Sequence, residues 1–220
     1  MRFNTSPRLR LLCTLCIFEA VKASESCPDY GDIRQPSVDP TVFNISDFAG
    51  TWYMVATTEP TLPAFCTCTR NEVSVHLPEG WYAYTAHTVC EGKFPISVPL
   101  KGKLSEDPRS PGLLHENFGL FNHTMPSLDP NMIFEARYDE QGRMQLAITY
   151  ACLGRMLPLP PLGQPKFSFN ILSRTTAWTK KELQDLVANV TSATRGLLDT
   201  SKIRFADQAV YDSCSQAIIV

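Results

Sequence analysis

The 220-residue sequence lacks the features that would place it at once in a common functional class. It has no long hydrophobic run, because its most apolar stretch, residues 11–17, is far shorter than the about 20 residues that a membrane-spanning helix needs. It has no large excess of charge of one sign, and a formal net charge of −2 excludes binding of nucleic acid through a basic surface. Its 44% hydrophobic content excludes a mainly disordered chain.

Motifs of common catalytic centres are also missing. The sequence contains none of the patterns GxSxG, HExxH, Walker A or GxGxxG, which place a nucleophile, a zinc ion or a phosphate in a defined local structure. Its four histidines, His76, His87, His115 and His123, are scattered, and no histidine stands near the cysteines in a zinc-ligand pattern. We therefore expect no metal site, no cofactor and no enzyme activity.

The N-terminus has the composition of a secretory signal peptide. Three arginines precede a short apolar core at residues 11–17, and Val21-Lys22-Ala23 places small residues at the cleavage positions. We predict that residues 1–23 are removed and that residues 24–220 form a secreted protein. No repeat, linker or charge run divides this mature chain, so we expect a single domain.

The eight cysteines have a different meaning after cleavage. Cys13 and Cys16 leave with the signal peptide, and with them a CxxC pattern that would indicate redox chemistry in a cytosolic protein. Three sequons, at Asn44, Asn122 and Asn189, agree with export and predict glycosylation. The remaining cysteines are even in number, which in an exported chain predicts three disulfides. They are Cys27, Cys66, Cys68, Cys90, Cys152 and Cys214.

After an irregular, polar lead-in at residues 24–48, apolar and polar residues alternate with the period of two that is typical of half-buried strands. Pro78-Glu79-Gly80 predicts a hairpin between two of these strands, and Glu140-Gln141-Gly142 predicts a second turn. Eight short, regularly spaced strands indicate an all-β sandwich or up-and-down barrel. We expect them at residues 51–57, 73–77, 81–85, 96–104, 112–118, 131–138, 143–152 and 166–173.

One helix is predicted after the strands. Thr179 and Glu182 have the spacing of a capping box, which satisfies the free N–H groups at the start of a helix. Leu183, Leu186, Val187 and Val190 follow on one stripe, so we expect a helix at about residues 180–193 that packs by one face against the sheet.

Several segments resemble the lipocalin family. Residues 48–53 (FAGTWY) resemble the GxW signature of the first lipocalin strand, and residues 171–175 (ILSRT) are similar to the segment whose arginine closes the barrel base. Residues 207–210 before Cys214, and Cys27-Pro28, resemble apolipoprotein D and the bilin-binding lipocalins. The resemblance implies an eight-stranded up-and-down antiparallel barrel with one C-terminal α-helix packed outside. The barrel would cover about residues 48–174, with a C-terminal tail to residue 220.

The resemblance also implies what the barrel does. An eight-stranded barrel has room for one small ligand, and we expect a hydrophobic one, such as a lipid, a carotenoid or a bilin, held for transport or sequestration. Leu62, Pro63, Phe65 and residues 156–165 would form an apolar rim that contacts a membrane surface. The expected inward-facing, ligand-contacting residues are Met54, Tyr84, Phe118, Phe134, Tyr138, Ile148, Tyr150, Phe167 and Phe169.

Two further structural roles are assigned. Arg174 over the indole of Trp52 suits a cation–π closure of the barrel base, in which Gly50 belongs to the same motif. The resemblance implies the disulfides Cys27–Cys152 and Cys68–Cys214, which leaves Cys66 with Cys90. The hairpin alone would equally allow Cys68 opposite Cys90, so these two assignments stay open.

A second resemblance gives an alternative function. Residues 59–66 and 111–114 are similar to the lipocalin domain of violaxanthin de-epoxidase. This implies an enzyme of the plastid lumen that acts on xanthophyll epoxides with ascorbate. Asp129 would then be the acid that protonates the epoxide oxygen, and Tyr150 the pocket tyrosine. A third hypothesis is a secreted protein-interaction module with a barrel filled by its own side chains.

Non-reducing peptide mapping of the secreted protein tests the predicted export and cross-links. We expect a mature N-terminus directly after Ala23 and three disulfide-linked peptide pairs, because an oxidising compartment keeps cysteines paired. Free thiols at Cys27 or Cys152 would contradict this framework.

Overall fold

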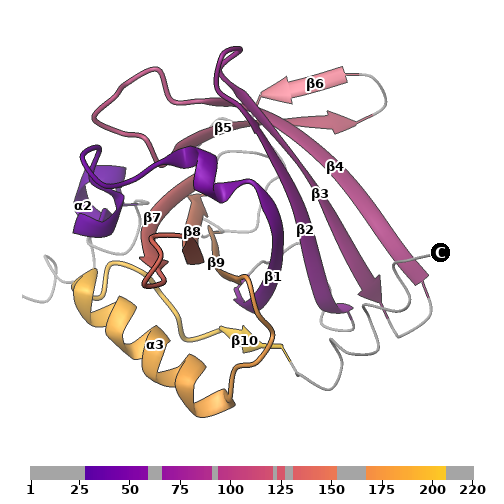
Figure 1. The fold of residues 1–220 in the computed structure, drawn as a ribbon. Helices are drawn as coiled ribbons and strands as arrows, with labels where there is room; N and C mark the ends of the chain where they lie inside the picture. The colour runs from indigo at the N-terminus through magenta and orange to yellow at the C-terminus, as the bar shows by residue number, and fades with distance from the viewer. Residues whose placement is uncertain are drawn as a thin grey trace, which may run out of the picture.

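A computed structural model describes residues 28–58, 66–90, 94–120, 123–126, 131–152 and 167–206 (Figure 1). The strands are β1 (Gly50–Thr57), β2 (Cys66–His76), β3 (Trp81–Cys90), β4 (Phe94–Leu104), β5 (Leu113–Leu120), β6 (His123–Pro126), β7 (Asn131–Tyr138), β8 (Met144–Cys152), β9 (Phe167–Ser173) and β10 (Arg204–Phe205). The helices are α2 (Tyr30–Ile33), α3 (Lys180–Ala193) and the 3-10 turns η1 (Pro36–Val38) and η2 (Ile45–Phe48).

Eight of the strands form an antiparallel up-and-down barrel, as the sequence predicted. Each pairs with the next along the chain, and β9 returns to pair with β1, which closes the sheet (Figure 1). Two strands were not predicted: β6 adds to β5, and β10 adds to β1. They have four and two residues, too few to show a clear period of two.

Cross-strand register identifies the outer face of the barrel. Paired residues point to the same side of a sheet, and successive residues along a strand point to opposite sides. Arg70, His87 and Ser97 are partners across β2, β3 and β4, and form a polar, solvent-accessible row. Tyr53 pairs with both Arg70 and Ser173, so the same outer face continues through β1 to β9.

The opposite face lies inside the barrel. It includes Trp52, which pairs with Asn71, and it continues through Met54 to Leu172 of β9. By the same register, the inner face carries Trp52, Met54, Thr57, Thr69, Asn71, Val73, Tyr82, Tyr84, Thr88, Ile96, Val98, Leu100, Ala147, Thr149, Ser168, Asn170 and Leu172.

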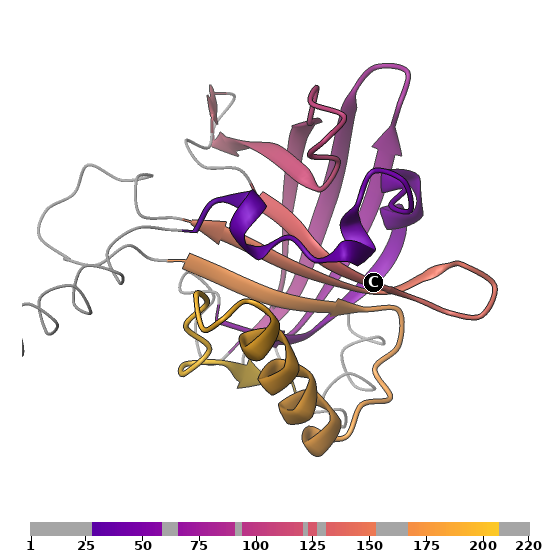
Figure 2. The ribbon, with the colours of Figure 1, turned by 90° about the vertical axis from the view of Figure 1, so that its left-hand side faces the viewer.

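On β8 and β9 the outer face is also apolar, because α3 and the N-terminal lead-in cover this side of the barrel (Figure 2). The predicted capping box starts α3: the Thr179 hydroxyl accepts from the Glu182 N–H, and the Glu182 carboxylate accepts from the Thr179 N–H. Its predicted stripe of leucines and valines is buried. The outer residues covered in this way include Leu146, Ile148, Tyr150, Phe169 and Ile171.

The lead-in differs from the irregular segment that the sequence predicted. It contains α2, η1 and η2, and its side chains Tyr30, Ile33 and Val38 are buried. The Gln35 N–H donates to the Phe134 carbonyl at 2.8 Å, and the Ser37 hydroxyl accepts from the Ala136 N–H at 3.1 Å, so the lead-in is fixed to β7. Helical turns of three or four residues are too short to produce a periodic pattern.

The strand pairing of β4 changes along its length. Among the residues that the structure describes, this strand pairs with β3 over its whole length but with β5 only from Lys101 to Leu104. Pro95 and Pro99 lie in the part for which the described residues of β5 give no partner. Because proline has no N–H to donate, it is tolerated at such an edge and discourages pairing with another chain.

Gly102 gives room to a large inner side chain. It lies opposite Tyr82, and a Cβ atom at this position would stand 2.6 Å from the tyrosine ring and 2.5 Å from the His115 carbonyl oxygen. We predict that Gly102→Ala lowers the free energy of unfolding by about 1–3 kcal/mol through overpacking. Gly31→Ala is the control, because nothing lies within 4 Å of a Cβ there. Urea unfolding of both variants checks this, and equal midpoints would contradict it.

Candidate ligand-binding site

One end of the barrel is closed by Trp52 and Arg174. The Trp52 side chain has no exposed surface, and its indole N–H donates to the Phe48 carbonyl at 2.7 Å. The Arg174 guanidinium carbon lies 3.7 Å from the centroid of the Trp52 ring, so a planar cation covers the indole face. The Phe48 ring, at the end of η2, packs against the same indole at 5.4 Å between centroids.

Backbone carbonyls hold the Arg174 guanidinium in place. Its Nη2 donates to the carbonyls of Asp47 and Ala49 at 2.7 Å each, its Nη1 to Thr51 at 2.8 Å, and its Nε to Met144 at 3.3 Å. These acceptors come from η2, the residue after it, β1 and β8, so one side chain joins the beginning of the barrel to its last strands. The planar fork of five N–H donors makes this possible, and a lysine could not reproduce it.

Gly50 allows this approach. Its φ of +106° is unfavourable for other residues, and a Cβ there would lie 3.0 Å from Nη1 of Arg174. Burial lowers the pKa of the Arg174 guanidinium, and the Asp47 carboxylate opposes that shift. Since arginine starts far above neutral pH, the group stays charged and keeps its cation–π contact.

Away from the base, the inner wall becomes accessible to solvent. Leu100 of β4 is 9% exposed. Val98 and Ile96 precede it on the same face of the strand and are 45% and 48% exposed. Large apolar side chains that fill a core would be buried. The inner face therefore offers exposed apolar surface along β4, where the pairing with β5 has ended.

Polar side chains are also buried on the inner face. The Thr57 hydroxyl donates to Oδ1 of Asn170 at 2.6 Å, and Nδ2 of Asn170 donates to Oγ of Ser168 at 2.8 Å. On the neighbouring part of the wall, the hydroxyls of Thr69 and Thr88 lie 2.9 Å apart. The sequence pattern does not identify these residues, because small polar side chains in strands are usually exposed and only the register shows that they face inward.

Comparison with known proteins agrees with this architecture. No protein-family model and no curated protein matches the sequence. Among solved structures, apocrustacyanin C2 matches with a TM-score of 0.58 and 16% identity, covering 88% of this chain and 96% of its own. Lobster apocrustacyanin A1 matches with a TM-score of 0.55 and 17% identity, over 83% and 88%. Insecticyanin from the tobacco hornworm Manduca sexta matches with 0.57 and 21%, over 84% and 87%.

These structures are lipocalins. The chain has the lipocalin fold. The structure thus confirms the fold that the GxW resemblance implied. Trp52, Gly50 and Arg174 lie together at the base of this barrel, in the arrangement that the sequence suggested.

Four of the nine predicted ligand-contacting residues lie on the inner face, at a register shift, or outside the described side chains. Register places Met54 and Tyr84 on the inner face of the lipocalin barrel. Tyr138 lies in β7 at a register shift next to Arg137, and burial raises the pKa of its hydroxyl, with the Asp47 carboxylate adding to the effect. Phe118 lies in β5, and its side chain is outside the part of the chain that the structure describes.

Register and ring contacts place the other five predicted contacts on the outer face. Ile148 pairs with Ile171 and Tyr150 pairs with Phe169, on the outer face that continues from Ser173. The remaining members of the group pack with them through ring contacts, Phe134 on Phe169 at 6.2 Å and Phe167 on Tyr150 at 5.8 Å between centroids. These side chains are apolar because they lie under α3 and the lead-in, which alternation alone cannot distinguish from the barrel interior. The outer-face residues of this group are Phe134, Ile148, Tyr150, Phe167 and Phe169.

The Cys66–Cys90 disulfide is present. Register explains the choice that the sequence left open: β2 has a shift between Cys66 and Cys68, so that Cys66 pairs with Cys90 while Cys68 pairs with Val89. The disulfide lies at the end of the β2–β3 hairpin that is remote from its turn.

The other two pairings stay predictions. Cys68 and Cys152 are also disulfide-bonded, but their predicted partners Cys214 and Cys27 lie outside the described residues. The signal peptide, the apolar rim, Asp129 and the sequon at Asn122 lie outside them as well.

Other expected features can be placed in part. Asn44 and Asn189 are exposed, and the Asn44 side chain caps η2 by accepting from the Ser46 N–H. Within the described ranges, no group of three or more histidine, cysteine, aspartate or glutamate side chains could hold a metal ion. None of the helices in the described part of the chain is long and apolar enough to cross a membrane.

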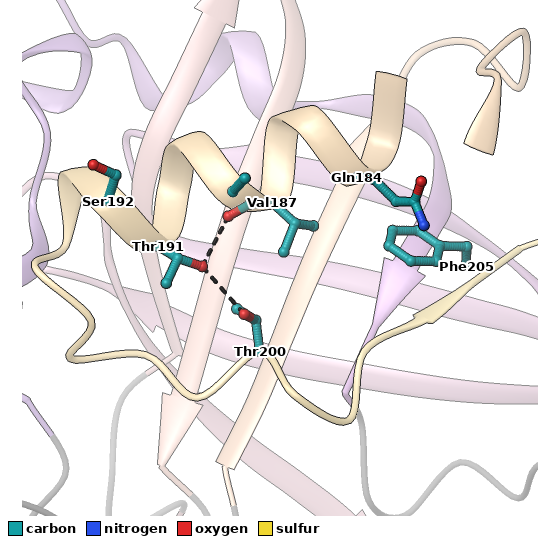
Figure 3. Close-up of a pocket in the computed structure, with 7 residues that line it drawn as sticks. Gln184, Val187, Thr191, Ser192, Thr200 and Phe205 are labelled. Atoms are coloured by element: carbon teal, nitrogen blue, oxygen red, sulfur yellow. Dashed lines mark hydrogen bonds between the residues drawn. The ribbon is translucent and has the colours of Figure 1, made fainter. Parts of the chain in front are cut away.

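A groove of about 540 Å³ lies outside the barrel, between α3 and β10 (Figure 3). Its wall is mostly apolar, and Phe205 stands at one end. The Thr191 hydroxyl donates to the Val187 carbonyl at 2.8 Å and lies 3.1 Å from the Thr200 hydroxyl, so the polar groups at its centre already have partners. This groove therefore offers little to orient a ligand, in contrast to the inner wall.

We predict that Arg174→Lys lowers the free energy of unfolding by about 2–3 kcal/mol, because several backbone carbonyls lose a charged donor and the indole loses its planar cover. Arg143→Lys is the matched control, since that side chain is exposed and pairs with Asp139 at the surface. Its effect should stay within about 0.5 kcal/mol. Urea unfolding followed by far-UV circular dichroism measures both, and equal losses would contradict the closing role of Arg174.

Proposed function

We propose that this protein binds a small hydrophobic ligand on the inner face of its barrel and holds it for transport or sequestration. The observation that carries the proposal is the exposure of Val98 and Ile96, large apolar side chains that face inward yet remain accessible to solvent. A barrel filled by its own side chains would bury them. Covering exposed apolar surface with a ligand is favourable by about 25 cal/mol per Å².

Two further observations support this proposal. The closed base with Trp52 and Arg174 gives the barrel one sealed end, so access is expected from the other. Two of the similar structures carry the name apocrustacyanin, a term for a protein without its bound partner group. Secretion is part of the proposal, and the Cys66–Cys90 disulfide fits an oxidising compartment.

The geometry gives no comparable support to a de-epoxidase. Register places Tyr150 on the outer face, where it packs against Phe167 and has about 1% of its surface exposed. A residue that contacts substrate inside the barrel would have to face inward. Asp129, the proposed acid, lies outside the described residues. We therefore propose binding without catalysis.

Fluorescence titration with N-phenyl-1-naphthylamine, an apolar dye that brightens in apolar sites, tests the proposal. We expect saturable binding that Val98→Glu weakens by at least about tenfold, because the ligand would have to bury a charge. Ser97→Glu is the matched control: it puts the same charge on the adjacent outer position and should leave the affinity within about twofold.

Equal weakening by both variants, or no saturable binding at all, would contradict the proposed site. Extraction of the secreted protein with organic solvent, followed by mass spectrometry and an absorption scan, then identifies the ligand that copurifies.

A further inference from the structure

Asn71 carries an unusual polar atom on the inner wall. Its side chain is 5% exposed, and register places it beside Trp52 on the inner face. Within the described part of the chain, Oδ1 of Asn71 is buried and accepts no hydrogen bond. Buried polar atoms nearly always have partners, because leaving one unpaired destabilises the folded state. We therefore expect a hydrogen-bond donor from outside the chain to pair with this oxygen.

The surroundings of Asn71 make this a defined position. Thr69, the next inward residue on β2, has its hydroxyl 2.9 Å from that of Thr88 on β3. These two hydroxyls can satisfy each other, so the amide oxygen of Asn71 is the acceptor left over. Polar groups in otherwise apolar pockets fix the orientation of a ligand.

The exposed apolar wall adjoins the same position. Asn71 lies in one cross-strand row with Ala86 and Val98, and Thr69 lies in the next row with Thr88 and Ile96. A molecule whose apolar part covers Val98 and Ile96 would therefore lie along the two rows that contain Asn71 and Thr69. The inner wall thus places an apolar surface and the unpartnered acceptor of Asn71 in adjacent cross-strand rows.

We propose that the ligand carries a hydroxyl or N–H group that donates a hydrogen bond to Oδ1 of Asn71. This inference rests on the proposed function, because it names the chemical class of ligand for the same site. It favours hydrophobic alcohols, phenols and amines or pyrroles with an N–H. It disfavours pure hydrocarbons, which have no donor, and carboxylate anions, which would place negative charge against an acceptor oxygen.

A matched pair of probes tests this subsite, the proposed hydrogen bond from the ligand to Oδ1 of Asn71. N-phenyl-1-naphthylamine has one N–H donor, and N-methyl-N-phenyl-1-naphthylamine is the same molecule with that donor replaced. We expect the wild-type protein to bind the N–H probe about fivefold more tightly, the effect of one hydrogen bond. Asn71→Leu, which is close in size and has no acceptor, should reduce this ratio to about one.

Two controls separate the subsite from general effects. Ser74→Leu changes an exposed outer position of the same strand and should keep the wild-type ratio. Asn71→Leu should also raise the urea midpoint of the ligand-free protein, because it removes a buried acceptor without a partner. Should Asn71→Leu fail to fold by circular dichroism, Asn71→Ala replaces it, because it also lacks the acceptor and should lose the preference. Asn71→Asp keeps an acceptor and should keep the preference.

The outcomes distinguish this inference from the proposed function. Equal affinity of the two probes for the wild type would overturn the subsite and leave ligand binding intact. A preference that persists in Asn71→Leu would also overturn it, because the N-methyl group would then act by its size. A preference that is lost in Asn71→Asp would overturn it as well, because that variant keeps an acceptor at the same position. Absence of binding of both probes to the wild type would instead overturn the proposed function.

Discussion

The closure of the barrel depends on the Arg174 guanidinium and the indole that it covers. β1 and β9 are far apart in the sequence and must meet before the sheet has no free edge there. Arg174 follows β9, and the carbonyls that it binds include those of Asp47 and Ala49, just before β1. The cation therefore stabilises the meeting point of the first and last strands and covers Trp52 at the same time. A single side chain thus stabilises both the closure of the sheet and the sealed base.

Closing the sheet also gives every strand an inner and an outer face, and on β8 and β9 the outer face is buried as well as the inner one. β2 to β4 alternate clearly, because their outer face meets solvent through residues such as Arg70 and Lys101. β8 is buried at nearly every position, since α3 and the lead-in cover its outer side. Alternation carries no information about direction there, so Ile148 and Tyr150 could not be assigned from the sequence.

Local signals predicted most of the fold. The eight barrel strands, the Pro78–Gly80 hairpin and the capped helix depend on short-range patterns, and the structure contains all of them. Short-range patterns do not predict features that depend on contacts between distant segments. The register shift in β2 selects Cys66 over Cys68 as the partner of Cys90, and it is a property of the paired strands rather than of either alone. The inward position of Asn71 also follows only from the register.

Under the proposed function, the inner wall carries a polar group that does not help the protein fold. A barrel selected for stability alone would fill its interior with apolar side chains, since a buried acceptor without a partner weakens the folded state. Asn71 lies beside the rigid base formed by Trp52 and Arg174, so its position is fixed before a ligand arrives. Exposed apolar surface at Val98 would supply most of the affinity, and one preplaced acceptor would decide which apolar molecules bind. Selectivity then depends on the same closure that completes the barrel.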